Sequence, residues 1–114
     1  MIQFTINLKC YAALISQTGT NDPTANVLGD EIGGISFERI QDGLYKINKP
    51  GGWDKSKTFY QCGPVGDTGI VSSGSGRVIM FFEGGDFYIN SLDVTGTPID
   101  DQMADAPVFI AIKD

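Results

Sequence analysis

Short stretches of alternating apolar and polar residues follow one another along this chain, and turn-forming residues separate them about every eight to twelve positions. Eight strands are predicted, at residues 3–17, 24–29, 34–40, 43–48, 57–62, 77–83, 86–92 and 107–113. Many short strands with frequent turns are typical of β-sandwiches and barrels. We therefore expect one all-β domain over residues 1–114, an antiparallel β-sandwich of Ig-like or jelly-roll-like type.

The first strand changes character along its length. Phe4, Ile6, Leu8 and Cys10 alternate with polar residues, which predicts that these four side chains share a buried face. From Tyr11 onward five consecutive residues are apolar or small, so both faces of the strand become apolar. We expect a β-bulge at this point or a switch from one sheet to the other.

Two later strands, at residues 77–83 and 107–113, are also apolar on both faces. A two-sided strand must be covered on both faces, and a single small sandwich has only one inside. Either another subunit or the protein's own loops must cover the surplus face. The residues expected at an interface or ligand contact are Trp53, Tyr11, Ile79, Phe81 and Phe109.

Three connections stand out between the strands. Gly84-Gly85 joins two β-rich runs and predicts a tight hairpin. Residues 63–76 contain five glycines, which predicts a flexible loop. Residues 93–106 are polar and acidic, and one short helical turn is expected near 101–104. The pair Asp100-Asp101 in this connection is expected to be a solvated turn.

Composition and charge narrow the range of partners. The 114 residues have a net charge of −6, with 41% hydrophobic and 19% charged residues, as in a globular protein. The acidic residues concentrate late in the chain, and such a surface repels phosphate backbones, so we expect no nucleic-acid partner. No stretch approaches the roughly 20 apolar residues of a membrane span. The basic cluster, Lys46, Lys49, Lys55 and Lys57, is either a solvated loop or a site for an acidic partner, such as the acidic end of a neighbouring copy.

The residues offer little catalytic chemistry. The chain has no histidine, which removes the commonest general base and metal ligand. No phosphate-binding glycine motif is present. Calcium at Asp100, Asp101 and Asp105 is the one cation site considered, and its spacing matches no EF-hand. We expect no catalytic residue, no cofactor and no metal.

The two cysteines leave an alternative open. Cys10 and Cys62 both fall in predicted strands, where free cysteines behave as small apolar residues. A disulfide between them needs an oxidising compartment. The first nine residues have no basic start and no unbroken apolar run, so we expect no signal peptide.

Trp53 is the single tryptophan and follows Pro50-Gly51-Gly52 in a polar loop. Three roles are open to it: a lid over the core, an anchor in an interface, or a stacking surface for a sugar ring. In the last case Tyr45 or Tyr60 would complete the platform.

The order of several short motifs resembles a small family of tailed-phage structural proteins, known chiefly from phages and prophages of Bacteroidetes hosts. The motifs lie at residues 11–20, 22–25, 27–28 and 32–33, and then at Phe37-Glu38-Arg39, Gly43-Leu44-Tyr45, Lys57-Thr58, Asp100-Asp101 and residues 106–112. They cover nearly the whole chain. The family often has tryptophan in the aromatic-arginine strand, where this chain has Phe37, and the 63–76 loop is individual to this chain.

The resemblance implies a non-enzymatic virion protein, made in the bacterial cytoplasm: a capsid decoration protein, or a subunit of a head or tail fibre or baseplate. Its partners would be copies of itself, with a trimer favoured, and other virion proteins, with a host-surface glycan as a further partner. The alternative is a carbohydrate-binding module that uses Trp53 and neighbouring loop aromatics. A hydrolase is disfavoured because histidine is absent.

Overall fold

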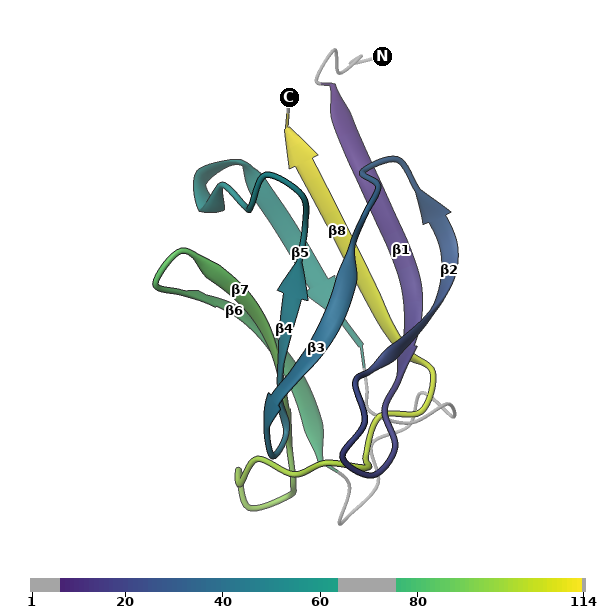
Figure 1. Ribbon diagram of the computed structural model, residues 1–114, viewed down its shortest axis with the longest axis vertical. Coiled ribbons are helices and arrows are strands. Elements are labelled where there is room, and N and C mark those ends of the chain that lie inside the picture. The colour runs from purple at the N-terminus through teal and green to yellow at the C-terminus, as the bar shows by residue number, and fades with distance from the viewer. Residues whose placement is uncertain (1–6, 64–75, 114) are drawn as a thin grey trace, which may run out of the picture.

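The computed structural model describes residues 7–63 and 76–113, and these residues form two packed β-sheets (Figure 1). The first sheet has the strand order β2-β1-β8-β5, with β1 (Leu8–Ser16), β2 (Thr24–Asp30), β5 (Thr58–Cys62) and β8 (Ala106–Lys113). The second sheet has the order β3-β4-β7-β6, with β3 (Ser36–Gln41), β4 (Leu44–Asn48), β6 (Arg77–Glu83) and β7 (Asp86–Leu92). All paired strands are antiparallel, which confirms the predicted all-β sandwich.

The predicted strand boundaries agree with the structure to within about two residues where the chain is described. Residues 3–6 of the first predicted strand, and nearly all of the glycine-rich 63–76 loop, lie outside the described residues. The β6–β7 hairpin turns at Gly84-Gly85, and both glycines have positive φ (61° and 86°). The hairpin predicted from this pair is confirmed.

The core lies between the two sheets and is built from alternate residues of the strands other than β2, whose residues are all exposed. Its fully buried large side chains are Tyr11, Tyr45, Phe87, Ile15, Ile47, Ile89 and Ile110. Each fully buried aliphatic or aromatic side chain contributes roughly 1.5–3 kcal/mol relative to exposure. Phe87 also stacks on Phe82 and meets the edge of Trp53, so aromatic contacts extend the core toward the end of the sandwich.

The face assigned to the start of β1 is wrong. Tyr11, Ala13 and Ile15 point into the core, so the alternate positions Leu8 and Cys10 point outward. Leu8 is 49% exposed. Because side chains alternate with a period of two, the large residues in the middle of the strand decide which set is inside. Phe4 and Ile6 lie outside the described residues.

The predicted irregularity near Tyr11 is a β-bulge. In the β1–β2 pairing Ala12 faces Gly29 while Ala13 faces Val27, so Leu28 is the extra residue. The strand β1 therefore stays in one sheet, and the bulge lies on β2, its edge partner. A bulge at an edge bends the strand and directs a side chain to a new position.

The helical turn predicted near 101–104 is absent. This segment forms bends, and Asp101 has a φ of 64°, which a helix excludes. The helical element of the described residues is the 3-10 turn η1 (Lys55–Lys57). Asp54 is its N-cap, and the Asp54 side chain accepts a hydrogen bond from Ser56 N. No helix in the described part of the chain is long and apolar enough to cross a bilayer.

The connections fall into two groups at opposite ends of the sandwich (Figure 1). The β1–β2, β3–β4 and β7–β8 connections lie together at one end, here called the lower end. The β2–β3, β4–β5 and β6–β7 connections lie at the other, called the upper end, which also holds the end of β8.

Candidate functional site

The side of the first sheet that faces away from the core carries a continuous apolar surface, called here the outer apolar face. It consists of Leu8, Cys10, Ala12, Leu14, Leu28, Phe59, Pro107, Phe109 and Ala111. The strand register brings them together: Cys10 pairs with Ala111, and Ala111 pairs with Phe59 on the next strand. These residues alternate with core residues, so both faces of this sheet are apolar.

The large side chains of this face are open to solvent. Leu28 is 66% exposed, Phe59 55%, Leu8 49% and Phe109 36%. Single exposed apolar residues are ordinary on protein surfaces, but a continuous patch that spans all four strands of a sheet marks an interaction surface. The exposed face is the surplus apolar face that the two-sided strands predicted.

A shallow hollow of about 350 Å³ lies in the outer apolar face. Its lining includes Ala12, Leu14, Leu28, Gln61, Pro107 and Phe109. Leu28 reaches this hollow because the β2 bulge removes it from the regular register. The hollow offers a place for an apolar side chain of a partner, in the way that interface anchors fill pockets.

The outside of the second sheet is more polar. Lys46 forms an ion pair with Asp86 at 3.5 Å, and Asn48 lies within hydrogen-bond distance of Glu38. Ile79 (39% exposed) and Phe81, which stacks on Tyr88 at 5.4 Å, form a small apolar patch there. Ile79 and Phe81 are therefore on the opposite side of the molecule from Phe109, and the structure does not bring these candidates together.

Tyr11 is a core residue. Its side chain is 1% exposed and packs at 6.4 Å from Phe37, so its assignment to an interface or ligand contact is wrong. From Tyr11 onward both faces of β1 are apolar, so the alternation there does not indicate which residues are inside. Burial raises the pKa of the Tyr11 hydroxyl, and Asp30 adds to this.

The two cysteines lie on opposite faces of the first sheet. Cys10 is on the outer apolar face, whereas Cys62 contacts the core and its Sγ lies 3.3 Å from Val78 O. Both are free, so the disulfide alternative is not formed. Burial raises the pKa of the Cys62 thiol.

Trp53 acts as a lid at the upper end. Its Nε1 donates to Ile47 O at 2.8 Å, and its ring meets Phe87 edge-on at 5.1 Å. Tyr45, one of the aromatics considered for a sugar platform, is fully buried at the lower end of the core, and Tyr60 packs against Phe82 and Phe87. The platform of Trp53 with Tyr45 is therefore not assembled.

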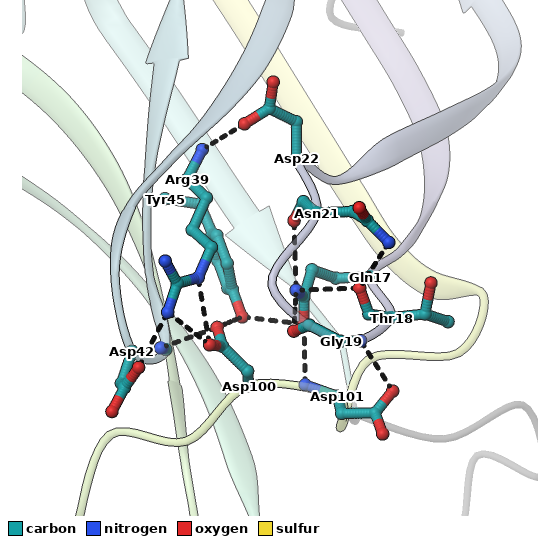
Figure 2. A network of polar contacts seen from close by, with 11 residues as sticks. Gln17, Thr18, Gly19, Asn21, Asp22, Arg39, Asp42, Tyr45, Asp100 and Asp101 are labelled. Carbon is teal, nitrogen blue, oxygen red and sulfur yellow. Dashed lines mark hydrogen bonds and ion pairs between the residues drawn. The ribbon is translucent and has the colours of Figure 1, made fainter.

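A network of polar contacts joins the connections of the lower end (Figure 2). Arg39 Nε and Nη2 donate to Asp100 Oδ2 at 2.9 and 2.7 Å, and Arg39 also pairs with Asp42. Gly43 N donates to Asp100 Oδ1 at 3.0 Å. Asp100 thus holds the β7–β8 connection against the β3–β4 turn.

The Tyr45 hydroxyl is the centre of this network. It lies 2.7 Å from Asp100 Oδ1 and 2.9 Å from Gln17 Oε1, and its single proton can be donated to one of them at a time. Burial and the neighbouring Asp100 raise the Tyr45 pKa far above its usual value. The Arg39 guanidinium makes the largest contribution to lowering the pKa of Asp100 to about 2. The hydrogen bonds from the Tyr45 hydroxyl and from Gly43 N lower this pKa further.

Gln17 is a functional part of this network that the sequence did not indicate. It is 2% exposed, and its Nε2 donates to the carbonyls of Gly19 and Asn21 at 2.8 and 3.0 Å. Its Oε1 accepts from Asp101 N at 2.6 Å. The one available signal is that Gln17 directly follows β1 and continues its inward-facing series, where a polar residue must have partners.

The solvated turn predicted for Asp100-Asp101 is wrong for Asp100, whose side chain is only 13% exposed. Asp101 is exposed, and its Oδ1 accepts from Gly19 N. The calcium alternative gains no support, because no group of three acidic, histidine or cysteine side chains with metal-binding geometry occurs within residues 7–63 and 76–113.

The network also gathers motifs that are far apart in the sequence. The Gln17–Gly19 turn, Asp22, Arg39, the Gly43-Leu44-Tyr45 turn and Asp100 all contribute to it, and Arg39 N donates to Asp22 Oδ1 at 2.8 Å. These contacts hold the lower end in shape. They therefore fit a structural role and leave the outer apolar face as the candidate interaction site. No protein-family model, curated protein or solved structure matches this chain.

Proposed function

We propose that this protein is a non-enzymatic structural subunit that assembles with copies of itself through the outer apolar face. The observation that carries the proposal is the row of exposed Leu8, Leu28, Phe59 and Phe109 across all four strands of one sheet. Exposure of such a surface to water costs roughly 25 cal/mol of free energy per Å² of apolar area. Association of two copies removes this cost from the area that it buries. Part of that gain offsets the entropy lost on binding.

The size of the face suits an interface between copies. Four strands at about 4.8 Å spacing and roughly eight residues of about 3.3 Å each give a face of about 500 Å² in projection. Side-chain relief increases the accessible area toward the roughly 800 Å² per partner of a standard interface. Sheets already pack face to face in this protein, and the same packing repeats between subunits.

We propose a virion as the setting, because the order of motifs resembles structural proteins of tailed phages. In that setting the protein is a capsid decoration protein or a subunit of a fibre or baseplate, and its other partners are virion proteins. Three copies that turn the outer apolar face toward a common axis would give the expected trimer. A face-to-face pair is the other symmetric arrangement that buries it.

The first test is the solution mass of the wild-type protein in about 300 mM NaCl, where attraction between exposed charges is screened, measured by light scattering on a sizing column over a concentration series. We expect an oligomer that Phe59→Gln with Phe109→Gln converts to a folded monomer, because the two glutamines leave the core unchanged and remove the largest exposed apolar groups. The matched control is Ile79→Gln, which removes an exposed apolar group from the opposite sheet.

Cys10 provides a second readout of the same test. It lies on the outer apolar face, so alkylation of Cys10 is expected to be slower in the oligomer than in the double variant, while the core-facing Cys62 reacts slowly in both. A wild-type protein that is monomeric at every concentration, with Cys10 equally reactive in both proteins, contradicts the proposal.

The carbohydrate-binding alternative rests on Trp53. The indole N–H is already bonded to Ile47 O and the ring edge is packed on Phe87, so the contacts of Trp53 stabilise the fold. No observation in the described residues favours a sugar platform over the assembly role. Absence of binding on a glycan array would remove this alternative.

A further inference from the structure

A second hollow lies at the upper end, beside Trp53, and is distinct from the outer apolar face. It has a volume of about 270 Å³ and lies between the β4–β5 connection and the ends of β5 and β8. Lys49, Lys57 and Lys113 line it together with Trp53 and Thr58. Three lysines around one hollow are unusual in a chain whose net charge is −6.

The lysines of this hollow outnumber its acidic groups. Among the described residues, Asp54 is the one acidic residue in its lining; its carboxylate accepts from Ser56 N at 3.0 Å and Ser56 Oγ at 2.7 Å, and it also feels the charge of Lys57. Neither Lys57 nor Lys113 forms an ion pair within residues 7–63 and 76–113. Lys49 Nζ lies 5.7 Å from the centre of the Trp53 ring and donates to Gly52 O. The hollow therefore presents ammonium groups that are available to an anion.

The connections of the lower end are acidic, in contrast to the lysine-lined hollow. Its connections carry six aspartates, Asp22, Asp42, Asp93, Asp100, Asp101 and Asp105, and none of the six lysines of the chain. Arg39 neutralises Asp100. Asp101 and Asp105 are exposed, and both have positive φ, which turns the backbone so that they stand at the corners of the β7–β8 connection. The upper end also carries Glu31, Asp54 and Glu83, so the excess of positive charge there is confined to the lysine-lined hollow.

We propose that the hollow beside Trp53 receives the carboxylates of Asp101 and Asp105 from a second copy of this chain. The contact joins the upper end of one copy to the lower end of the next, so it is heterologous and extends into a stack. This proposal rests on the proposed function only because both require that copies of the chain associate. A second copy is the occupant because the complementary charge is present on the same molecule, at the opposite end.

The two contacts between copies differ in their response to salt. Salt screens the attraction between exposed charges, with a Debye length that falls from about 30 Å at 0.01 M to about 10 Å at 0.1 M. Burial of apolar surface is not weakened in this way. End-to-end association can therefore be measured on its own in the Phe59→Gln, Phe109→Gln background, where the outer apolar face no longer associates.

The experiment is sedimentation velocity of that double variant, combined with the emission of Trp53, which is the only tryptophan. We expect concentration-dependent association in about 20 mM NaCl, with a shift of Trp53 emission, and an association constant at least about tenfold lower in about 300 mM NaCl. Lys57→Gln with Lys113→Gln should abolish both signals. Lys46→Gln is the control, because Lys46 lies on the outside of the second sheet and pairs with Asp86.

The decisive variant is Asp101→Asn with Asp105→Asn, since asparagine tolerates the positive φ at both positions. These changes make the net charge less negative, so general repulsion between copies would decrease and association would strengthen. The proposed contact instead requires that association is lost.

Unchanged or stronger association of this variant overturns the proposal. A second result would also overturn it: Trp53 emission that changes on addition of a soluble dicarboxylate while the protein remains monomeric. Failure here leaves the outer-face test unaffected, because that test is run in about 300 mM NaCl, where screening weakens the end-to-end contact and burial of the outer apolar face is not weakened.

Discussion

Asp100 connects parts of the chain that are more than fifty positions apart. Its carboxylate accepts from Arg39, Gly43 and Tyr45, and these contacts fix the β7–β8 connection on the end of the second sheet. The side chain is mostly buried, so the ion pair with Arg39 is less screened than one on the surface. The shape of the lower end therefore depends on one charged group.

The first residue-scale prediction concerns acid. The folded-state pKa of Asp100 is about 2, below the usual value of about 3.9, so unfolding takes up a proton between these values. The contribution of about 2 kcal/mol to stability is present above about pH 4 and is lost as pH falls toward about 2. Urea unfolding at pH 7, 4 and 2.5 measures it. Asp100→Asn should have a lower free energy of unfolding than the wild type at pH 7, and this free energy should fall less between pH 7 and pH 2.5. An equal fall in both proteins would contradict the lowered pKa of Asp100.

The two buried tyrosines give a matched pair of substitutions. The Tyr11 hydroxyl is buried without a hydrogen-bond partner in the described residues, whereas the Tyr45 hydroxyl is bonded in the network. Tyr45→Phe should lower the free energy of unfolding by roughly 1–3 kcal/mol, because Asp100 and Gln17 lose their partner. Tyr11→Phe should be neutral or stabilising by up to about 1 kcal/mol. Thermal and urea unfolding measure the stability of both variants. An equal decrease in the free energy of unfolding would show that the Tyr11 hydroxyl has a hydrogen-bond partner.

At the scale of elements, register and turns decide which side chains reach the surface. The middle of β1 buries Tyr11, Ala13 and Ile15, and this choice places Cys10 and Leu14 outside. The bulge opposite Ala12 and Ala13 then adds Leu28 to the same side. A shift of one residue in this strand would exchange the core face and the outer apolar face.

The β3–β4 turn supplies the element-scale prediction. Gly43 has a φ of 64°, and a Cβ there would stand against Ile99 N and Ser91 O, so Gly43→Ala must displace backbone. Gly51 has a φ of 81° with open space around it, so Gly51→Ala bears only the conformational cost of about 1 kcal/mol. We expect Gly43→Ala to cost at least about 3 kcal/mol and to broaden NMR signals of the β7–β8 connection. Equal unfolding midpoints for the two variants would contradict this.

For the whole molecule, apolar and charged surfaces are separated. The outer apolar face lies along one side of the sandwich, and the lysine-lined hollow and the aspartate-rich connections lie at its two ends. In the proposed assembly, copies would associate sideways by apolar burial and lengthwise by charge. The first contact is insensitive to salt screening and the second depends on it, so ionic strength selects between the two modes.

The sequence was sufficient for the architecture. Alternation with turn residues located all eight strands, and the Gly84-Gly85 pair located the β6–β7 hairpin. Two-sided strands also indicated a surplus apolar face. These features are local, because side-chain alternation and turn preferences act within a few residues of one another.

Only the tertiary structure decided which face of each two-sided strand is inside and which residues meet. Tyr11 and Phe109 look alike in the sequence, yet one is buried and the other is exposed. The burial of Asp100 and Gln17 likewise depends on Arg39 and Tyr45, which distant strands supply. A single sequence records which side chains are apolar, but pairing between strands far apart in the chain determines what covers them, and that pairing is set by the packing of the whole sandwich.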